Sequence, residues 1–265
     1  MDITVMSMNL RVHVKRDGVN AWPRRVPSVG EVIREHGPDI IGVQEALVPM
    51  MDDLKIFLAG YERVGKGRDG KDQDEHCAIY VRSSVLSIKK SGQFWLSETP
   101  SVPSTSWDSA CPRICTWVLV SENRVPASQL LILNTHLDHM SQSAREHGAV
   151  LIASFLKSFT QEHQCPAILM GDLNSTPDNP VVQFLSGQQN LAGNRVKLTD
   201  ASVINHCQTP AATFHGFSGR TDGETIDYVF LTPDIHPFRF EVDQRHYLER
   251  YPSDHFPVIV GLGVD

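Results

Sequence analysis

The sequence contains little cysteine, and its cysteines are not spaced as a disulfide framework or a zinc site requires. The five are Cys77, Cys111, Cys115, Cys165 and Cys207. Cys111 and Cys115 are four residues apart, but no second pair completes a tetrahedral set of ligands. A chain of 265 residues can bury enough surface to fold without covalent cross-links. We therefore expect reduced thiols and a cytoplasmic protein.

The sequence also lacks a long apolar run, a signal-peptide pattern and an excess of basic residues. No stretch approaches the roughly 18 apolar residues of a membrane span. Residues 1–6 begin directly with strand-like alternation, without the basic start of a secretory signal. The formal net charge of −7 argues against a tight, sequence-independent grip on long nucleic acid. It leaves a small or single-stranded phosphate substrate open, and we expect no membrane and no obligatory protein partner.

No Gly/Ser-rich linker, low-complexity tract or repeat divides the chain, so we predict one domain over residues 1–265. Apolar runs of strand length recur at residues 3–8, 40–43, 78–81, 116–120, 130–133, 167–170, 226–231 and 258–260. Helical spacing is present at residues 29–36, with Pro27 in the first turn, at 47–58 and at 144–159, the longest. Because strands outnumber helices and several form hairpins, two packed sheets with outer helices are expected.

Polar side chains gather where these apolar runs end. The residues in such positions are Asn9, Gln44, Glu45, Asn134, His136, Asp172, Asn174, Asp227, Asp254 and His255. Strand ends at one rim of a sheet converge in space, so these groups can line a single cleft. One polar residue at a strand end usually marks only a turn. Six strand ends that together carry carboxylate, amide and imidazole groups indicate a functional site.

In order and approximate spacing these segments resemble the endonuclease/exonuclease/phosphatase superfamily, which includes DNase I-like nucleases, AP endonucleases, inositol polyphosphate phosphatases and deadenylases. The matching pieces are Asn9, Gln44-Glu45, Asn134-Thr135-His136, Gly171-Asp172-Leu173-Asn174, Ile226-Asp227-Tyr228 and Ser253-Asp254-His255. Within the superfamily the motifs are most similar to stand-alone hydrolases somewhat like the deadenylase and nocturnin side. The resemblance implies an α/β fold, a four-layer sandwich of two facing, mostly antiparallel sheets flanked by helices.

The resemblance also implies a metal site. Hydrolysis of a phosphate ester needs charge neutralisation at the phosphoryl oxygens, an oriented water and help for the leaving oxygen. A hard cation such as Mg²⁺ prefers carboxylate and amide oxygens. The resemblance implies Glu45 as the leading ligand, with Asn9 and Asp254 beside it, for Mg²⁺ or, as second choice, Mn²⁺.

The same resemblance implies catalytic roles for five residues. Asp172 would orient or deprotonate the attacking water, and Asn174 would hold that water or a phosphate oxygen. His255 and Asp227 look like the family's His–Asp pair, in direct contact with the phosphoryl group; whether His255 is a base or a transition-state stabiliser stays open. His136 would bond a phosphate oxygen.

Substrate contacts are expected from four further residues. Arg113 is the first choice for clamping the phosphate, and Arg11 is the second. His215 is expected to face the cleft, and Glu75 to orient His136. The basic, glycine-containing segment 63–71 lacks the spacing of a phosphate-binding loop, so we interpret it as a solvated loop.

Three functions are compatible with these residues. The first is a Mg²⁺-dependent phosphoesterase that hydrolyses a phosphodiester bond in a nucleotide or in short or single-stranded nucleic acid. The alternative is a phosphomonoesterase acting on inositol, sugar or nucleotide phosphates. A catalytically silent binding module is the third, and it is disfavoured because every matched position holds the expected residue type.

Overall fold

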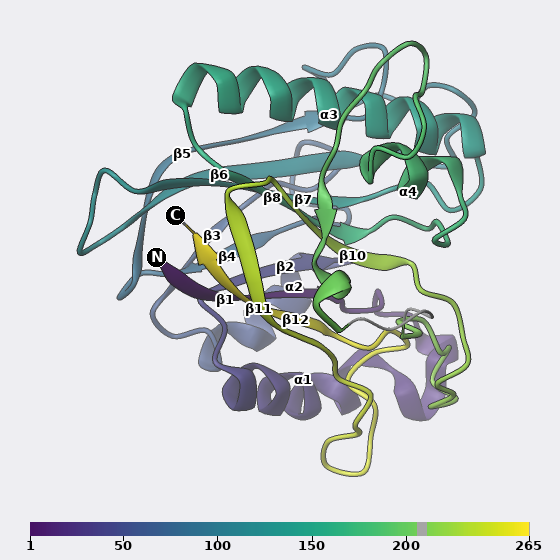
Figure 1. Cartoon of the computed structure of the whole chain (residues 1–265). Coiled ribbons are helices and arrows are strands. Elements are labelled where there is room, and N and C mark those ends of the chain that lie inside the picture. The colour runs from purple at the N-terminus through teal and green to yellow at the C-terminus, as the bar shows by residue number, and fades with distance from the viewer. Residues whose placement is uncertain (206–210, 265) are drawn as a thin grey trace.

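Two sheets pack face to face, and helices cover their outer sides (Figure 1). The computed structural model describes residues 1–205 and 211–264. The first sheet combines strands from the beginning and end of the chain, and the second is built from its middle. This arrangement confirms the predicted α/β sandwich.

The first sheet has the spatial order β11-β12-β1-β2-β4-β3. Its strands are β1 Asp2–Asn9, β2 Ile40–Gln44, β3 Tyr61–Val64, β4 Ile79–Arg82, β11 Ile235–Val242 and β12 Val258–Val264. β1 and β2 run parallel, and the other described neighbours run antiparallel.

The second sheet has the order β5-β6-β7-β8-β10-β9. Its strands are β5 Leu86–Trp95, β6 Ile114–Glu122, β7 Gln129–His136, β8 Ala167–Asp172, β9 Thr199–Asp200 and β10 Asp227–Leu231. Here β7 and β8 are the parallel pair, so each sheet places one parallel pair near its centre.

Helix α1 spans Trp22–His36 and begins earlier than the sequence predicted. Pro23 lies in the first turn, whereas the prediction placed Pro27 there; Pro27 instead lies inside the helix. The apolar spacing missed the first turn because its buried face includes a charged residue, Arg25, next to Trp22.

The remaining helices are η1 Lys15–Asn20, α2 Val48–Asp53, η2 Leu54–Ile56, α3 Gln142–His163, α4 Pro180–Leu185 and η3 Ala201–Asn205. The predicted helix at 144–159 is α3, the longest of those described. The predicted helix at 47–58 is divided into α2 and the 3₁₀ helix η2.

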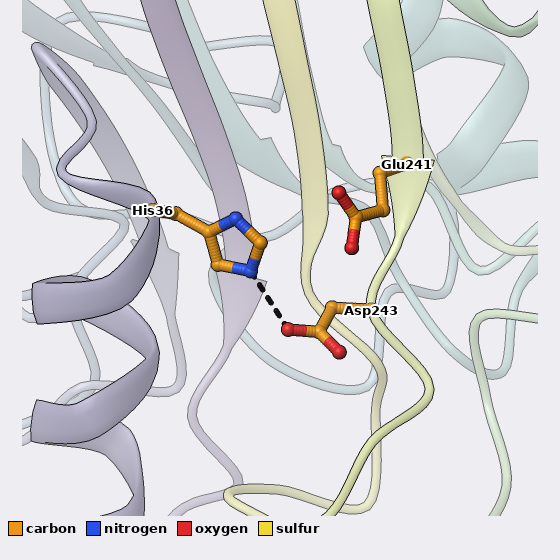
Figure 2. Close-up of side chains that lie close together, drawn as sticks. All are labelled: His36, Glu241 and Asp243. Carbon is orange, nitrogen blue, oxygen red and sulfur yellow. Dashed lines mark hydrogen bonds and ion pairs between the residues drawn. The ribbon is translucent and has the colours of Figure 1, made fainter.

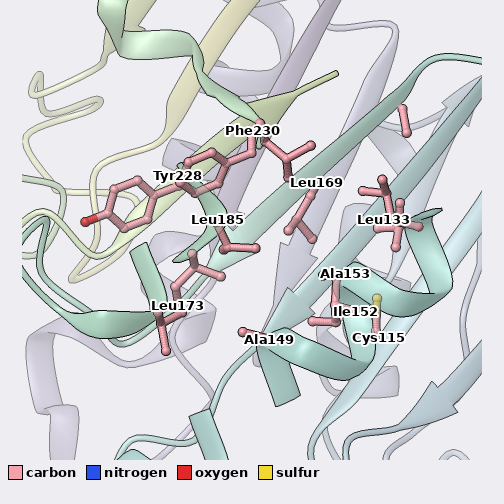
Figure 3. Packing of buried hydrophobic residues seen from close by; sticks show 14 of the residues in the cluster. Cys115, Leu133, Ala149, Ile152, Ala153, Leu169, Leu173, Leu185, Tyr228 and Phe230 are labelled. Carbon is pink, nitrogen blue, oxygen red and sulfur yellow. The ribbon is translucent and has the colours of Figure 1, made fainter. Parts of the chain in front are cut away.

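The apolar core lies in three layers that correspond to the sandwich. One cluster fills the space between the sheets and includes Val5, Val118 and Val229. A second lies between the first sheet and helices α1 and α2. The third lies between the second sheet and helices α3 and α4, and Figure 3 shows residues such as Leu133 and Ile152 from it.

Side-chain alternation directs the polar strand ends into the space between the sheets. Successive residues of a strand point to opposite faces. In β1, Ile3 and Val5 belong to the inter-sheet core, so Asn9 continues the same face. In β8, Ile168 and Met170 belong to that core, so Asp172 does likewise. The strands that build the core therefore also end in the site.

The four described cysteines, Cys77, Cys111, Cys115 and Cys165, are free, and Cys207 lies outside the described residues. Among residues 1–205 and 211–264, no helix combines the length and apolarity needed to cross a membrane.

Candidate active site

Three of the predicted catalytic side chains lie side by side across the second sheet because of strand register. β7 and β8 place His136 opposite Asp172, and β8 and β10 place Asp172 opposite Asp227. All three side chains are buried. Residues 36 and 55 positions apart in sequence therefore form one row at the end of the inter-sheet space.

His255, from the segment before β12, joins this row from the first sheet. Its Nδ1 lies 2.8 Å from Asp227 Oδ2, and its Nε2 lies 3.8 Å from Asp172 Oδ2. Burial alone would lower the pKa of His255, but Asp227, Asp172 and Asp254 together raise it to about 10. Burial and the charge of Asp227 raise the pKa of Asp172 to about 7. A charged imidazole thus lies beside a carboxyl group that titrates near neutral pH.

Asn174 ties His136 to Asp172. Its amide Nδ2 donates to His136 Nε2 (2.9 Å) and to the carbonyl of Leu137 (3.0 Å). Its backbone N–H donates to Asp172 Oδ1 (2.9 Å), an arrangement that uses a positive φ of 45° at Asn174. Burial holds the pKa of His136 well below its usual value, so this histidine is neutral. The predicted grouping of His136, Asp172 and Asn174 is present.

Asn9 lies at the predicted position but presents the opposite end of its amide. Its Nδ2 donates to Glu45 Oε1 (3.1 Å) and Asp172 Oδ2 (3.0 Å). Its oxygen accepts from the backbone N–H of Arg11 (2.8 Å), which fixes the amide orientation. Asn9 thus links the Glu45 carboxylate to Asp172, and its role as a metal ligand stays a prediction.

Glu45 and Asp254 are suited to hold a hard cation. Both carboxylates line the same cleft of about 570 Å³ as Asp172 and His255. Burial, together with the charge of Glu45, raises the pKa of Asp254, although His255 and Arg11 act in the other direction. A divalent cation would relieve this carboxylate repulsion, and oxygen ligands are the type that Mg²⁺ prefers. The residues present fit such an ion.

Both predicted arginines line the cleft. Arg11 pairs with Asp17 through Nε (3.0 Å) and lies 3.7 Å from Asp254 Oδ2. Arg113 is buried, with Nη2 2.9 Å from His139 Nδ1 and Nε 3.6 Å from an Asp138 oxygen. The Nε of Arg113 is buried and has no hydrogen-bond partner.

Two expected contacts are replaced by others. Glu75 lines the cleft as predicted, but its carboxylate binds Arg68 (3.1 and 3.2 Å) and makes no hydrogen bond with His136. His215 does not line the cleft; its ring stacks on Phe256 at a centroid distance of 3.9 Å. Its Nδ1 accepts the N–H of Gly219 (3.1 Å), so the ring is used in packing.

The sequence prediction missed Arg68 and Phe214. Arg68 belongs to the segment interpreted as a solvated loop, yet it lines the cleft and is held by Glu75 and Asp74. Phe214 also lines the cleft and packs edge-on against His255, with centroids 5.0 Å apart. Four acidic residues within positions 69–75 were a signal that an arginine there could be anchored.

A second cluster of one histidine and two carboxylates lies away from the cleft, beside the end of α1. Figure 2 shows His36 pointing toward Asp243, with Glu241 two residues earlier on the same segment, in β11. The His36 Nε2 to Asp243 Oδ2 distance is 2.7 Å. Nothing in the sequence motifs pointed to this group.

Comparison with known proteins places this geometry in a family. The sequence profile of the Endonuclease/Exonuclease/phosphatase family matches residues 6–255. A family member of known structure from Bacteroides thetaiotaomicron is 34% identical, with a TM-score of 0.90 over 100% of this chain and 96% of that chain. The mannosyl-6-phosphatase Bt3783 of the same species is 35% identical, with a TM-score of 0.89 over 98% and 99% of the two chains.

More distant proteins share the fold. The human nocturnin catalytic domain is 19% identical with a TM-score of 0.72, over 100% of this chain and 95% of that one. Among curated proteins, angel homolog 2 of Bos taurus is 22% identical over 211 residues, 72% of this chain. The chain matches only 36% of the length of that relative.

The profile match covers nearly the whole chain, and the row of His136, Asp172 and Asp227 meets His255 where the motifs predicted. The resemblance inferred from the sequence is confirmed. The chain belongs to the endonuclease/exonuclease/phosphatase family of hydrolases.

Proposed function

We propose that this protein is a divalent-metal-dependent phosphatase that removes a terminal phosphate from a small sugar phosphate. The observation that carries the proposal is the convergence of Asp172, Asn174 and the Asp227–His255 pair on one cleft walled by cations. The match to a mannosyl-6-phosphatase at 35% identity supports the sugar phosphate as substrate class. We also infer that residues 1–265 act as a single domain, which the profile match over residues 6–255 supports.

In this proposal Glu45 and Asp254 hold the cation, with Mg²⁺ the first choice and Mn²⁺ the second. When bound, the ion supplies charge neutralisation at the phosphoryl oxygens and orients the phosphate for in-line displacement. Asn9 keeps Glu45 and Asp172 at a fixed separation through its two amide hydrogen bonds. The carboxylates of Glu45 and Asp172 then face the same phosphorus atom of the substrate.

Asp172 accepts a proton from the water that attacks phosphorus, the P–O bond to the sugar breaks, and the sugar oxygen takes a proton from solvent as it leaves. The Asp172 pKa of about 7 suits this role, because a general base works best when its pKa is near the operating pH. His255, charged and held by Asp227, donates a hydrogen bond to the phosphoryl group as negative charge develops. The Nδ2 of Asn174 and the neutral ring of His136 hold a phosphate oxygen or the water, and Arg113 clamps the phosphate.

A phosphodiesterase acting on a nucleotide or short single strand is the alternative. The sequence motifs favoured this alternative, but the nocturnin catalytic domain is only 19% identical to this chain and supports the fold alone. The net charge of −7 also favours a small substrate over a polymer of phosphates. We therefore rank the monoester first.

The test compares hydrolysis of mannose 6-phosphate, p-nitrophenyl phosphate and bis-p-nitrophenyl phosphate, each with EDTA or added Mg²⁺ or Mn²⁺. The proposal expects phosphate release from the monoesters, loss of activity in EDTA and recovery with metal. Preferential cleavage of the diester would select the alternative. A protein that binds these esters without turnover in either metal would be the silent binding module.

A further inference from the structure

Arg25 is a fully buried arginine that binds backbone carbonyls from three separate segments around the site. Its Nη1 donates to the carbonyls of Leu10 and Pro252, both at 2.7 Å. Its Nη2 donates to Arg11 (2.9 Å) and its Nε to Asn20 (2.6 Å). The side chain is 0% exposed. All four bonds end on carbonyl oxygens, so the guanidinium connects main-chain segments and no carboxylate is bonded to it.

The segment held through Leu10 and Arg11 carries the N–H groups that orient two site residues. The N–H of Arg11 fixes the oxygen of Asn9 (2.8 Å), and the N–H of Val12 donates to Glu45 Oε2 (2.7 Å). Arg11 adopts a positive φ of 55°, a conformation that a non-glycine residue keeps only when its surroundings hold it. With its carbonyls bound to Arg25, this turn directs its N–H groups into the site.

The segment held through Pro252 leads directly to Asp254 and His255. Here β12 enters the sheet, where it pairs with β1 from Ser7 and Val258 onward. The pairing of the two strands ends at that pair. Beyond it, Arg25 donates to the carbonyl of Leu10, which follows β1, and to the carbonyl of Pro252, which precedes β12. The Arg25 guanidinium is thus connected to all three site residues. It reaches Asn9 and Glu45 through the turn at residues 10–12, and Asp254 through the segment that begins at Pro252.

Arg25 has the chemistry for such a role. A planar guanidinium presents five donors in a fixed fork, so it can hold several carbonyls in one geometry. Burial lowers the pKa of Arg25 to about 10, which leaves it charged at neutral pH. The guanidinium carbon of Arg25 lies 5.3 Å from the ring centroid of Trp22 and 5.4 Å from that of Phe217. These two aromatic contacts restrict its position further.

We propose that Arg25 is a positioning residue that sets the affinity of the Glu45–Asp254 site for its divalent cation, by holding the two loops that carry and orient these ligands. This inference rests on the proposed metal-dependent function. Outer groups that orient metal ligands typically contribute about 10–100-fold to metal affinity. Removal of Arg25 is expected to weaken cation binding by that factor.

Arg82, at the opposite end of the first sheet, offers a matched control. Arg82, at the end of β4, also clamps backbone carbonyls, those of Gly37 and Pro38 (2.9 Å to the latter), and it stacks on Tyr61. It lies beside the start of β2, whereas Glu45 follows the end of β2. Arg82→Met therefore removes a comparable clamp without touching the metal site.

The experiment measures Mn²⁺ binding directly, by electron paramagnetic resonance of free Mn²⁺ and by calorimetry, for wild type, Arg25→Met, Arg25→Lys and Arg82→Met. The thermal midpoint in EDTA is recorded for each. Arg25→Met is expected to raise the Mn²⁺ dissociation constant about 10–100-fold, Arg25→Lys less, and Arg82→Met not at all, although both methionine variants lower the midpoint.

The possible outcomes are distinguishable. If folded Arg25→Met binds Mn²⁺ like wild type, Arg25 has only a structural role and the inference is overturned. If Arg25→Met does not fold, Arg25→Lys decides in the same way, because lysine cannot reproduce the fork. If wild type itself binds no Mn²⁺, the proposed function fails, independently of Arg25.

Discussion

Two regions of this protein each bring one histidine together with two carboxylates, and they differ in how their charges are balanced. The cleft cluster consists of Asp172, Asp227 and His255. The outer cluster, drawn in Figure 2, consists of His36, Glu241 and Asp243. In both, the histidine is within 2.8 Å of a carboxylate. Residue types and spacing alone would rank them equally as sites.

In the cleft cluster the protein balances the charge of the two acids only in part. His255 is the nearest cation to both carboxylates, and Asp227 Oδ1 has no hydrogen-bond partner although it is buried. Buried polar groups usually have a partner, so an unsatisfied oxygen indicates a site prepared for something else. The cluster opens on the cleft through Asp172 and His255.

In the outer cluster the acids are paired internally. Asp243 accepts from His36, from Arg245 Nε (2.8 Å) and from the hydroxyl of Tyr247 (2.6 Å). Glu241 pairs with Arg239 and lies 3.7 Å from Arg245. The group links the end of α1 to the end of β11, and its positive charges leave no need for a cation. The comparison teaches that a reactive site differs from a structural ion-pair cluster in how fully its carboxylates are paired with cations, more than in which ligand types it contains.

The largest effect should follow from Asp172→Asn, which keeps the shape of the side chain and removes the proton acceptor. We expect kcat toward p-nitrophenyl phosphate to fall about 10²–10⁴-fold, the range for a positioned general base. Circular dichroism should show an unchanged fold. Asp243→Asn is the matched control in the outer cluster and should keep kcat close to that of wild type. Equal losses in the two variants would remove the distinction drawn here.

The second effect is on stability, and it belongs to the outer cluster. Although burial would raise it, hydrogen bonds from His36, Arg245 and Tyr247 hold the pKa of Asp243 well below its usual value. Asp243→Asn should therefore lower the free energy of unfolding by about 2 kcal/mol at pH 7, the scale of hydrogen bonds to a charged group. A carboxyl group whose pKa is lowered by folding stabilises the folded protein at pH values above its pKa in the unfolded chain, near 4. This stabilisation is lost as the pH falls below that value. Urea unfolding at pH 7 and pH 3 should show the difference shrinking with acid.

The third effect has the opposite sign and belongs to the cleft. Because burial and Asp227 raise the pKa of Asp172 to about 7, its stabilising contribution is present at low pH and lost as pH rises through that value. In EDTA at pH 8, Asp172→Asn should raise the free energy of unfolding by about 1 kcal/mol, since it removes a buried charge. At pH 3, below the pKa of this group in both the folded and the unfolded protein, the two proteins should coincide. A destabilised variant at pH 8 would contradict this sign.

These contrasts also show what the sequence could predict. Asp172, Asp227 and His136 were predicted because they lie at the ends of apolar strands and match the ordered motifs of the family, and the strand register then places them side by side. The ordered motifs between Asn9 and His255 supplied His255 as well. Apolar runs of strand length predicted the two sheets, and helical spacing at residues 144–159 predicted the long helix α3.

What the sequence could not predict depends on contacts between distant segments. The amide of Asn9 is turned by a backbone N–H in the following loop, and Glu75 is taken by Arg68. His215 stacks on Phe256, 41 positions away, so a polar residue beside a strand was used for packing. Arg25 was invisible because a charged residue in a buried helix face breaks the apolar pattern.

The smallest effect should come from Glu241→Gln, and its smallness is the point of the experiment. The Glu241 side chain is 34% exposed, and its partners Arg239 and Arg245 are 45% and 51% exposed. Solvent-exposed ion pairs contribute about 0–1 kcal/mol, so the free energy of unfolding should change by less than about 0.5 kcal/mol and kcat should not change. If the outer cluster were a metal site, loss of one of its three ligands would instead abolish a metal-dependent rise in thermal midpoint. Thermal unfolding of wild type and Glu241→Gln with EDTA, Mg²⁺ and Zn²⁺ distinguishes these cases, because a structural ion-pair cluster predicts the same response to each metal in both proteins.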